Sequence, residues 1–166
     1  MNYAKWNKCD FVNGKGVRTS LFVTGCSHHC KGCWNKSIWE HEAGFEFTKE
    51  VSDEIINYVK SNKSIQGLSL LGGEPFDNLE LIDFITKFKK ECPDRDIWVW
   101  SGYTYEQIIN NKHKLKLLSL CDILVDGRFN LELKDLTLKF RGSKNQRIIN
   151  VKESLKNSKI KLNNLS

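Results

Sequence analysis

Three cysteines, Cys26, Cys30 and Cys33, lie within eight positions of one another in the stretch "TGCSHHCKGCWN" (residues 24–35). Thiolates are the usual ligands of iron–sulfur clusters and common ligands of zinc, so this spacing indicates a metal centre. Three thiolates on a four-iron cluster would leave one iron without a protein ligand. An open position of this kind is typical of a catalytic metal rather than a structural one.

The competing interpretation is a closed zinc site that only holds the loop. A structural zinc ion takes four ligands, and the fourth would then be Cys9, His28 or His29. We favour the open cluster because the cysteine loop follows a buried strand and lies beside other glycine-rich strand ends. On this interpretation the two histidines face solvent or support the ligands, and they do not bind the metal.

Four short apolar runs precede the residues that could do chemistry, and we predict strands at residues 19–24, 67–71, 96–100 and 122–125. They are apolar on both faces, which is typical of parallel strands covered on both sides. The residues that follow them are, in order, Gly25-Cys26, Gly72-Gly73-Glu74, Ser101-Gly102 and Asp126-Gly127. Because ligands bind at the carboxyl edge of a parallel α/β sheet, the sequence predicts one site built from four loops.

Helical periodicity fills the intervals between these strands, at residues 48–60, 77–90 and 104–111. Thr48 is a predicted helix cap, and capping boxes are predicted from Asp77 with Glu80 and from Thr104 with Gln107. Alternating strands and helices indicate an α/β fold with a mostly parallel sheet. A closed eight-stranded barrel takes about 250 residues, so we predict a partial, laterally open (β/α) barrel.

A single domain at residues 1–151, with a C-terminal tail at 152–166 that is expected to fray, accounts for the 166 residues. The net charge is +6, but the lysines are spread along the chain without the spacing of a nucleic-acid-binding motif. No apolar run approaches the roughly 20 residues of a membrane span, and the first residues lack a signal-peptide pattern. We therefore expect a cytoplasmic protein with no nucleic-acid or membrane partner, and cysteines that are thiols or metal ligands.

The Cys26-x3-Cys30-x2-Cys33 spacing after the first of these strands, with "GGEP" (residues 72–75) closing the second, resembles the radical S-adenosylmethionine enzymes. The resemblance implies one 4Fe-4S cluster, whose open iron chelates the amino and carboxylate groups of S-adenosylmethionine. It also implies that the loop of Gly72, Gly73 and Glu74 supports the amino group.

The nucleoside contacts follow the resemblance less closely. Many members of the superfamily carry an aromatic residue just before the third cysteine, where this chain has Gly32, and the aromatic Trp34 comes just after it. We expect Gly32, Cys33 and Trp34 to line the nucleoside, with a core position as the alternative for Trp34. Ser101 and Asp126 are further candidate cofactor contacts because each follows a predicted strand.

Longer stretches resemble the activating enzymes of glycyl radical enzymes, and in particular those of anaerobic ribonucleotide reductase. They are residues 9–26, 96–104, 124–129 and 140–151, and the resemblance covers residues 1–151. It implies that reduced flavodoxin or a similar donor supplies one electron, that S-adenosylmethionine is cleaved, and that a glycine in the large reductase subunit becomes a radical. No side-chain acid or base is then required. Resemblance and charge make Arg18, Arg128, Arg141 and Arg147 candidates for docking.

Three alternatives are left open at this point. The chain could activate another glycyl radical enzyme, or act on a small molecule as the short radical enzymes of deazapurine synthesis do. From a different class, it could be a zinc-stabilised adaptor that binds a partner without chemistry.

Overall fold

The computed structural model describes residues 1–165 and has a mixed α/β fold, and Ser166, the last residue of the predicted tail, lies outside the described residues. One sheet has the strand order β3-β1-β2-β4-β5-β6-β7. The strands are β1 (Asn2–Asp10), β2 (Arg18–Val23), β3 (Phe45–Glu46), β4 (Gly67–Gly72), β5 (Asp96–Trp100), β6 (Ile123–Asp126) and β7 (Arg147–Asn150).

The four predicted strands form the centre of the sheet and correspond to β2, β4, β5 and β6. They pair in parallel, whereas β1, β3 and β7 add antiparallel pairs at the two sides. The prediction of a mostly parallel α/β sheet is therefore confirmed for its centre, and the sheet is not closed. Its description as a partial barrel stays a prediction.

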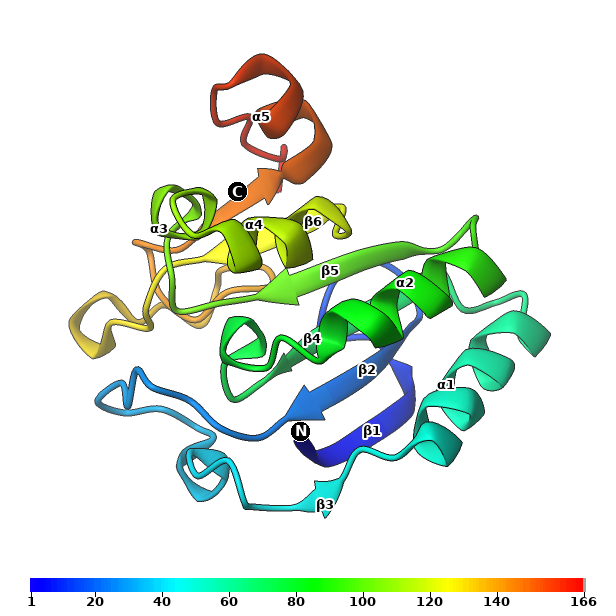
Figure 1. Ribbon diagram of the computed structural model, residues 1–166. Helices are drawn as coiled ribbons and strands as arrows, with labels where there is room; N and C mark the ends of the chain where they lie inside the picture. Colours follow the sequence, from blue (N-terminus) through cyan, green and yellow to red (C-terminus); the bar gives the residue numbers. More distant parts are fainter. Residues whose placement is uncertain (166) are drawn as a thin grey trace.

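Helices cover one face of this sheet, where α1, α2 and α4 lie side by side (Figure 1). The helices are α1 (Lys49–Ser61), α2 (Leu81–Glu91), α3 (Tyr105–Ile109), α4 (Lys112–Ser119) and α5 (Val151–Asn157), with 3-10 turns at Lys36–Ile38, Pro75–Asp77 and Leu131–Leu133. Alternate strand residues such as Leu70 and Val99 belong to the main core, which also contains residues of these helices. Their neighbours point the other way, and Trp98 belongs to a second cluster with Val125 and Ile148. Helices α1, α2 and α4 therefore leave this second face of the sheet uncovered.

Two of the three predicted helix starts are confirmed. The Thr48 side chain accepts a hydrogen bond from the Val51 N–H at the start of α1, and Thr104 and Gln107 form a capping box at the start of α3. The box predicted from Asp77 and Glu80 is wrong, because α2 begins without a side-chain cap. Asp77 instead belongs to a 3-10 turn, and its carboxylate is used by distant residues described below.

Arg18 is buried, so it cannot serve as the docking residue suggested by resemblance. Its exposed fraction is 0%, and its guanidinium bonds to the Ser69 hydroxyl at 2.8 Å and to the Asp96 carboxylate at 2.7 Å. The ring of Trp98 lies 5.4 Å from the guanidinium carbon. This cluster fixes β2, β4 and β5 together.

The C-terminal segment folds against β7. Helix α5 is followed by a bridge between Ile149 and Leu162 and by a hydrogen bond from the Asn163 N–H to the Ile148 carbonyl (2.8 Å). All six cysteines are free thiols, and two of them, Cys92 and Cys121, belong to the core. No helix within residues 1–165 combines the length and apolarity needed to cross a lipid bilayer.

Candidate functional site

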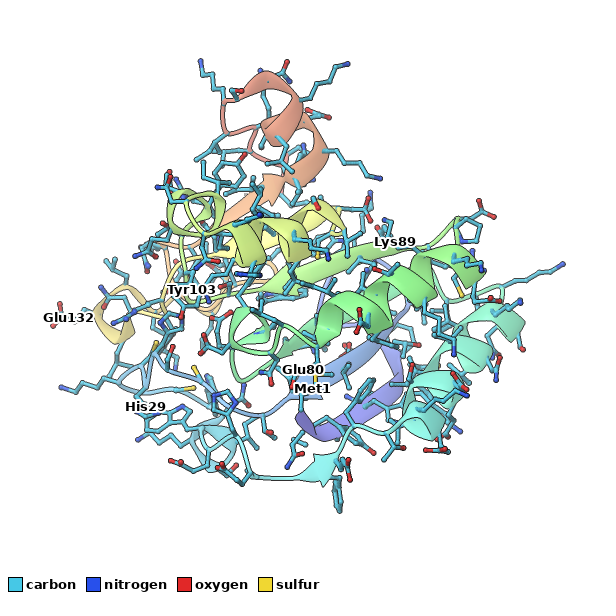
Figure 2. All side chains as sticks on the ribbon, in the orientation of Figure 1. Met1, His29, Glu80, Lys89, Tyr103 and Glu132 are labelled. Carbon is cyan, nitrogen blue, oxygen red and sulfur yellow. The ribbon has the colours of Figure 1, made fainter. Side chains whose placement is uncertain are left out.

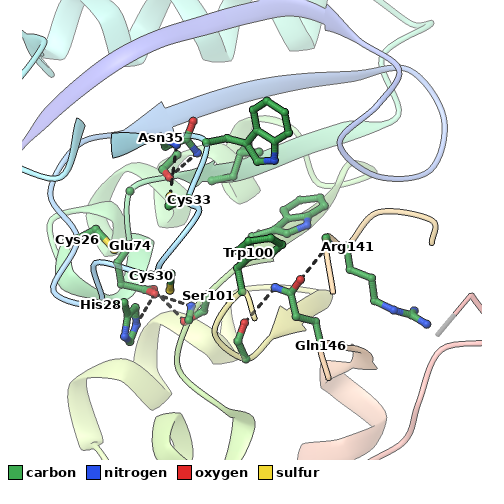
Figure 3. Close-up of a pocket in the computed structure, with 18 of the residues that line it drawn as sticks. Cys26, His28, Cys30, Cys33, Asn35, Glu74, Trp100, Ser101, Arg141 and Gln146 are labelled. Atoms are coloured by element: carbon green, nitrogen blue, oxygen red, sulfur yellow. Dashed lines mark hydrogen bonds and ion pairs between the residues drawn. The ribbon is translucent and has the colours of Figure 1, made fainter. Parts of the chain in front are cut away.

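A cavity of about 470 Å³ lies at the carboxyl ends of β4 and β5, on the face of the sheet that α1 and α2 do not cover (Figure 3). Its volume falls in the range typical of small-molecule sites. Eight of the predicted site residues line it: Cys26, Cys30, Cys33, Trp34, Gly72, Gly73, Glu74 and Ser101. Gly127 also lines the cavity, so the loops that follow all four predicted strands meet at one place, as the sequence predicted.

The cysteine loop is closed at its base by backbone hydrogen bonds. The Gly25 N–H donates to the Ile38 carbonyl at 2.9 Å, and the Cys26 N–H donates to the Trp39 carbonyl at 2.8 Å. Gly25 has φ +83°, a conformation that L side chains rarely adopt, so glycine is needed where the chain leaves β2. Burial raises the pKa of the Cys26 and Cys30 thiols, so metal binding would release their protons.

The glycine-rich end of β4 packs directly against the start of this loop. The Glu74 N–H donates to the Gly25 carbonyl at 2.7 Å. A Cβ atom on Gly73 would stand only 2.3 Å from the same carbonyl oxygen. The second glycine of the "GGE" sequence thus permits a backbone contact that any side chain would prevent.

Glu74 is buried, and its carboxylate is already engaged by the protein. Its side chain is 1% exposed. Oε1 accepts hydrogen bonds from the Phe76 N–H (3.0 Å) and the Ser101 hydroxyl (2.9 Å), and Oε2 accepts one from the Gly102 N–H (2.7 Å). The ring nitrogen Nε2 of His28 lies 2.9 Å from Oε2. Glu74 therefore joins the loops after β4 and β5 to the cysteine loop.

His28 has the supporting position expected for it. Its Nδ1 accepts a hydrogen bond from Arg128 Nε at 3.1 Å, which leaves the proton of a neutral ring on Nε2, facing Glu74. His29, in contrast, is exposed and stacks on the ring of Trp39, with centroids 4.6 Å apart.

A second carboxylate, that of Asp77, bonds to the backbone of the cysteine loop at Ser27. It accepts hydrogen bonds from the Ser27 N–H (2.9 Å) and the Tyr103 hydroxyl (2.8 Å), and Lys114 Nζ lies 3.5 Å away. Burial opposes the charged form, but these hydrogen bonds and the lysine hold the pKa of Asp77 below its usual value. The sequence does not indicate this role, because no local pattern relates Asp77 to these three partners.

Asn35 is another residue that sequence reasoning missed. Its side-chain amide donates to the Gly72 carbonyl at 2.9 Å, and its backbone N–H donates to the Cys33 sulfur at 3.3 Å. It therefore links the third cysteine to the glycine-rich loop. Its place two residues after Cys33 was the only signal available in the sequence.

Three predicted cofactor residues differ in their placement. Trp34 stands at the mouth of the cavity with 81% of its surface exposed, so the alternative of a core position is wrong. Gly32 is not among the lining residues and faces the Leu131 side chain. Asp126 borders a neighbouring polar pocket, and its carboxylate accepts hydrogen bonds from the Tyr105 N–H and from Arg147.

The donor set fits an iron–sulfur cluster. The cysteine loop brings three free thiols to the wall of one cavity, beside a glycine-rich loop that a ligand can approach closely. In residues 1–165 no three His, Cys, Asp or Glu side chains gather around one point as ligands of a single ion would. A four-iron cluster makes a different demand, because each thiolate binds a different iron atom.

Comparison with known proteins identifies similar chains. Residues 12–149 match the family described as "4Fe-4S single cluster domain". The chain is 43% identical over 150 residues to the anaerobic ribonucleoside-triphosphate reductase-activating proteins of Haemophilus influenzae and Escherichia coli K12, covering 88% of this chain and 96% of each relative. It is 40% identical over 151 residues to the protein of that name from Enterobacteria phage T4, covering 89% of this chain and 93% of the relative.

Proposed function

Since the chain belongs to the family of anaerobic ribonucleoside-triphosphate reductase-activating proteins and contains a 4Fe-4S single cluster domain, we propose that it activates an anaerobic ribonucleotide reductase by radical chemistry. Such activating proteins are oxidoreductases. The observation that carries the proposal is the meeting of three free cysteines and the "GGE" loop at one cavity.

Cys26, Cys30 and Cys33 are the proposed ligands of the cluster. When bound, the reduced cluster would supply one electron for cleavage of S-adenosylmethionine at its sulfonium, releasing methionine, and the adenosyl product would take a hydrogen atom from the Cα of a glycine in the large reductase subunit. The protein supplies position, electrostatics and exclusion of water. We propose reduced flavodoxin or a similar donor as the source of the electron, in the cytoplasm.

The chain's own residues then act by holding the loops in place. With its carboxylate engaged by Ser101 and two backbone N–H groups, Glu74 fixes the loop proposed to receive the amino group. Asn35 sets the distance between that loop and Cys33. Trp34 at the mouth is proposed to contact the nucleoside, together with Gly32 and Ser101; Asp126 is proposed to act from its neighbouring pocket.

The open side of the sheet suits a large substrate. We propose that the sheet is a partial, laterally open barrel of the radical S-adenosylmethionine type, whose uncovered face admits a protein segment. Residues 1–151 are proposed to form a single radical S-adenosylmethionine domain.

The test is anaerobic purification and reconstitution with iron and sulfide, followed by visible and electron-spin-resonance spectra of the reduced protein with and without S-adenosylmethionine. A reducible cluster whose signal changes on adding the cofactor is expected, followed by a glycyl radical on added reductase. A colourless zinc protein would overturn the proposal in favour of an adaptor. Cofactor cleavage without a radical on the reductase would point to another glycyl radical enzyme or to a small molecule.

A further inference from the structure

The connection between β6 and β7, residues 127–146, leaves three leucine side chains exposed to solvent. Leu131, Leu133 and Leu136 are all exposed, and Leu136 is 82% exposed. Single exposed leucines are ordinary, but a large exposed apolar area often marks a binding surface. We call these three residues the leucine cluster.

The exposure of the leucine cluster is imposed by an ordered backbone. Lys134 and Ser143 form an antiparallel bridge, and the Asp135 N–H donates to the Gly142 carbonyl at 3.2 Å. At the tip, the Asp135 carboxylate accepts hydrogen bonds from the Thr137 N–H (2.9 Å) and the Thr137 hydroxyl (2.6 Å). This turn has Leu136 at its centre, so the side chain is fixed outward. A partner would pay little ordering entropy here.

Other side chains of the same connection line the candidate site. Phe129, Phe140 and Arg141 line the cavity that the three cysteines also line. Figure 2 places Glu132 of the connection and His29 of the cysteine loop at the same end of the molecule. A chain held by the leucine cluster would therefore lie at the cavity mouth.

The positive charge of the β6–β7 connection indicates the charge expected of its partner. The connection contains five basic and two acidic residues, a net charge of +3. One acid, Asp135, lies 3.7 Å from Lys144. Within the described residues neither Lys134 nor Lys139 has an ion-pair partner, and Lys134 Nζ lies 5.1 Å from the ring centroid of Trp34. These cations favour a partner with acidic side chains.

We propose that the β6–β7 connection is the docking element for the glycine-bearing partner, and that it binds a segment with apolar side chains flanked by acidic ones. The leucine cluster would take the apolar side chains, while Lys134 and Lys139 would take the carboxylates. This inference rests on the proposed function for the identity of the partner.

The test compares Leu136→Asp with Phe45→Asp in the reconstituted protein under anaerobic conditions. Phe45 is a matched control because it is also a large exposed apolar residue, 66% exposed, on β3 at the opposite edge of the sheet. The dissociation constant for the large reductase subunit is measured by fluorescence anisotropy. Leu136→Asp is expected to raise it roughly tenfold or more, and Phe45→Asp less than about twofold.

Charge is tested with the double variant Lys134→Glu and Lys139→Glu. Its binding should be weaker and should lose much of the wild type's dependence on salt. Cleavage of S-adenosylmethionine by chemically reduced protein, without reductase, should be unchanged in Leu136→Asp and Phe45→Asp. A wild type that cleaves the cofactor but does not bind the reductase would contradict the proposed partner.

Three other outcomes would overturn the docking proposal without contradicting the proposed partner. They are unchanged reductase binding in Leu136→Asp, equal weakening by Phe45→Asp, or a change in the oligomeric state of Leu136→Asp, which would assign the surface to a second copy of the chain. Because Leu136 is mostly exposed, its substitution should leave the melting temperature unchanged, and this is checked first.

Discussion

Glu74→Gln is expected to destabilise the protein even in the absence of iron and cofactor. Each carboxylate oxygen of Glu74 accepts one backbone hydrogen bond, from the Phe76 N–H on Oε1 (3.0 Å) and from the Gly102 N–H on Oε2 (2.7 Å). Glutamine has only one oxygen, so in either orientation its NH2 group faces one of these two donors. The Ser101 hydroxyl can rotate to accept a hydrogen bond, but a backbone N–H cannot.

The magnitude follows from this count. One partly or fully buried N–H loses its acceptor, at a cost of about 1–3 kcal/mol, and the remaining hydrogen bonds lose the strength that an ionised acceptor gives. We expect the free energy of unfolding to fall by about 2–4 kcal/mol in total. For a chain of this size that corresponds to a lower melting temperature by about 5–15 °C.

The assay is urea unfolding of the metal-free protein, followed by circular dichroism. The matched control is Glu54→Gln, the same chemical change at an exposed position of α1, which should alter stability by no more than about 0.5 kcal/mol. A Glu74→Gln protein as stable as this control would refute the argument. It would mean that the Glu74 carboxylate is available to a ligand and that its hydrogen bonds do not hold the loops together.

Three further predictions concern other parts of the site and the fold. Cys30→Ala should abolish cluster-dependent cleavage of S-adenosylmethionine but keep the far-ultraviolet spectrum, because the core does not depend on that loop; retained cleavage would contradict the ligand role. Gly73→Ala should lower stability by about 1–3 kcal/mol and weaken cofactor binding, since its Cβ would meet the Gly25 carbonyl oxygen at 2.3 Å; titration of the reconstituted protein tests this. The Arg147 hydrogen bond lowers the pKa of Glu106 from 4.5 to about 2, so this pair stabilises the protein above pH 4.5 and the gain is lost as the pH falls toward 2. Melting temperatures of wild type and Glu106→Gln should differ at pH 6 by the equivalent of about 0.5–1 kcal/mol and converge near pH 2.

Much of the sheet could be predicted from the local pattern of apolar and polar residues. The four central strands were found within about a residue of their ends because buried parallel strands are continuously apolar and are bounded by glycine or polar residues. The caps at Thr48 and Thr104 were found because a cap bonds to a backbone N–H only three residues ahead. The flanking strands β1, β3 and β7 were missed, because none of them contains a continuous apolar run like those of the central strands.

The capping box predicted at Asp77 is wrong because contacts between distant residues replace the local ones. The spacing of Asp77 from Glu80 matches a capping box, but a carboxylate can accept only a few hydrogen bonds, and Ser27 and Tyr103 take them. Arg18 likewise looks like a surface cation in the sequence, yet it is buried against Asp96. In both cases a tertiary partner outweighed the local preference.

From sequence alone, the spacing of Cys26, Cys30 and Cys33 indicates the proposed cluster ligands, and the glycines after each strand indicate their neighbourhood, because both patterns lie within short stretches of the chain. Tertiary structure alone decided how these pieces are held. Ser27 and Asp77 are 50 residues apart, and Ser101 and Glu74 are 27 apart. Contacts over such separations arise only when parallel strands place their carboxyl ends side by side, and no local periodicity records which side chains then meet.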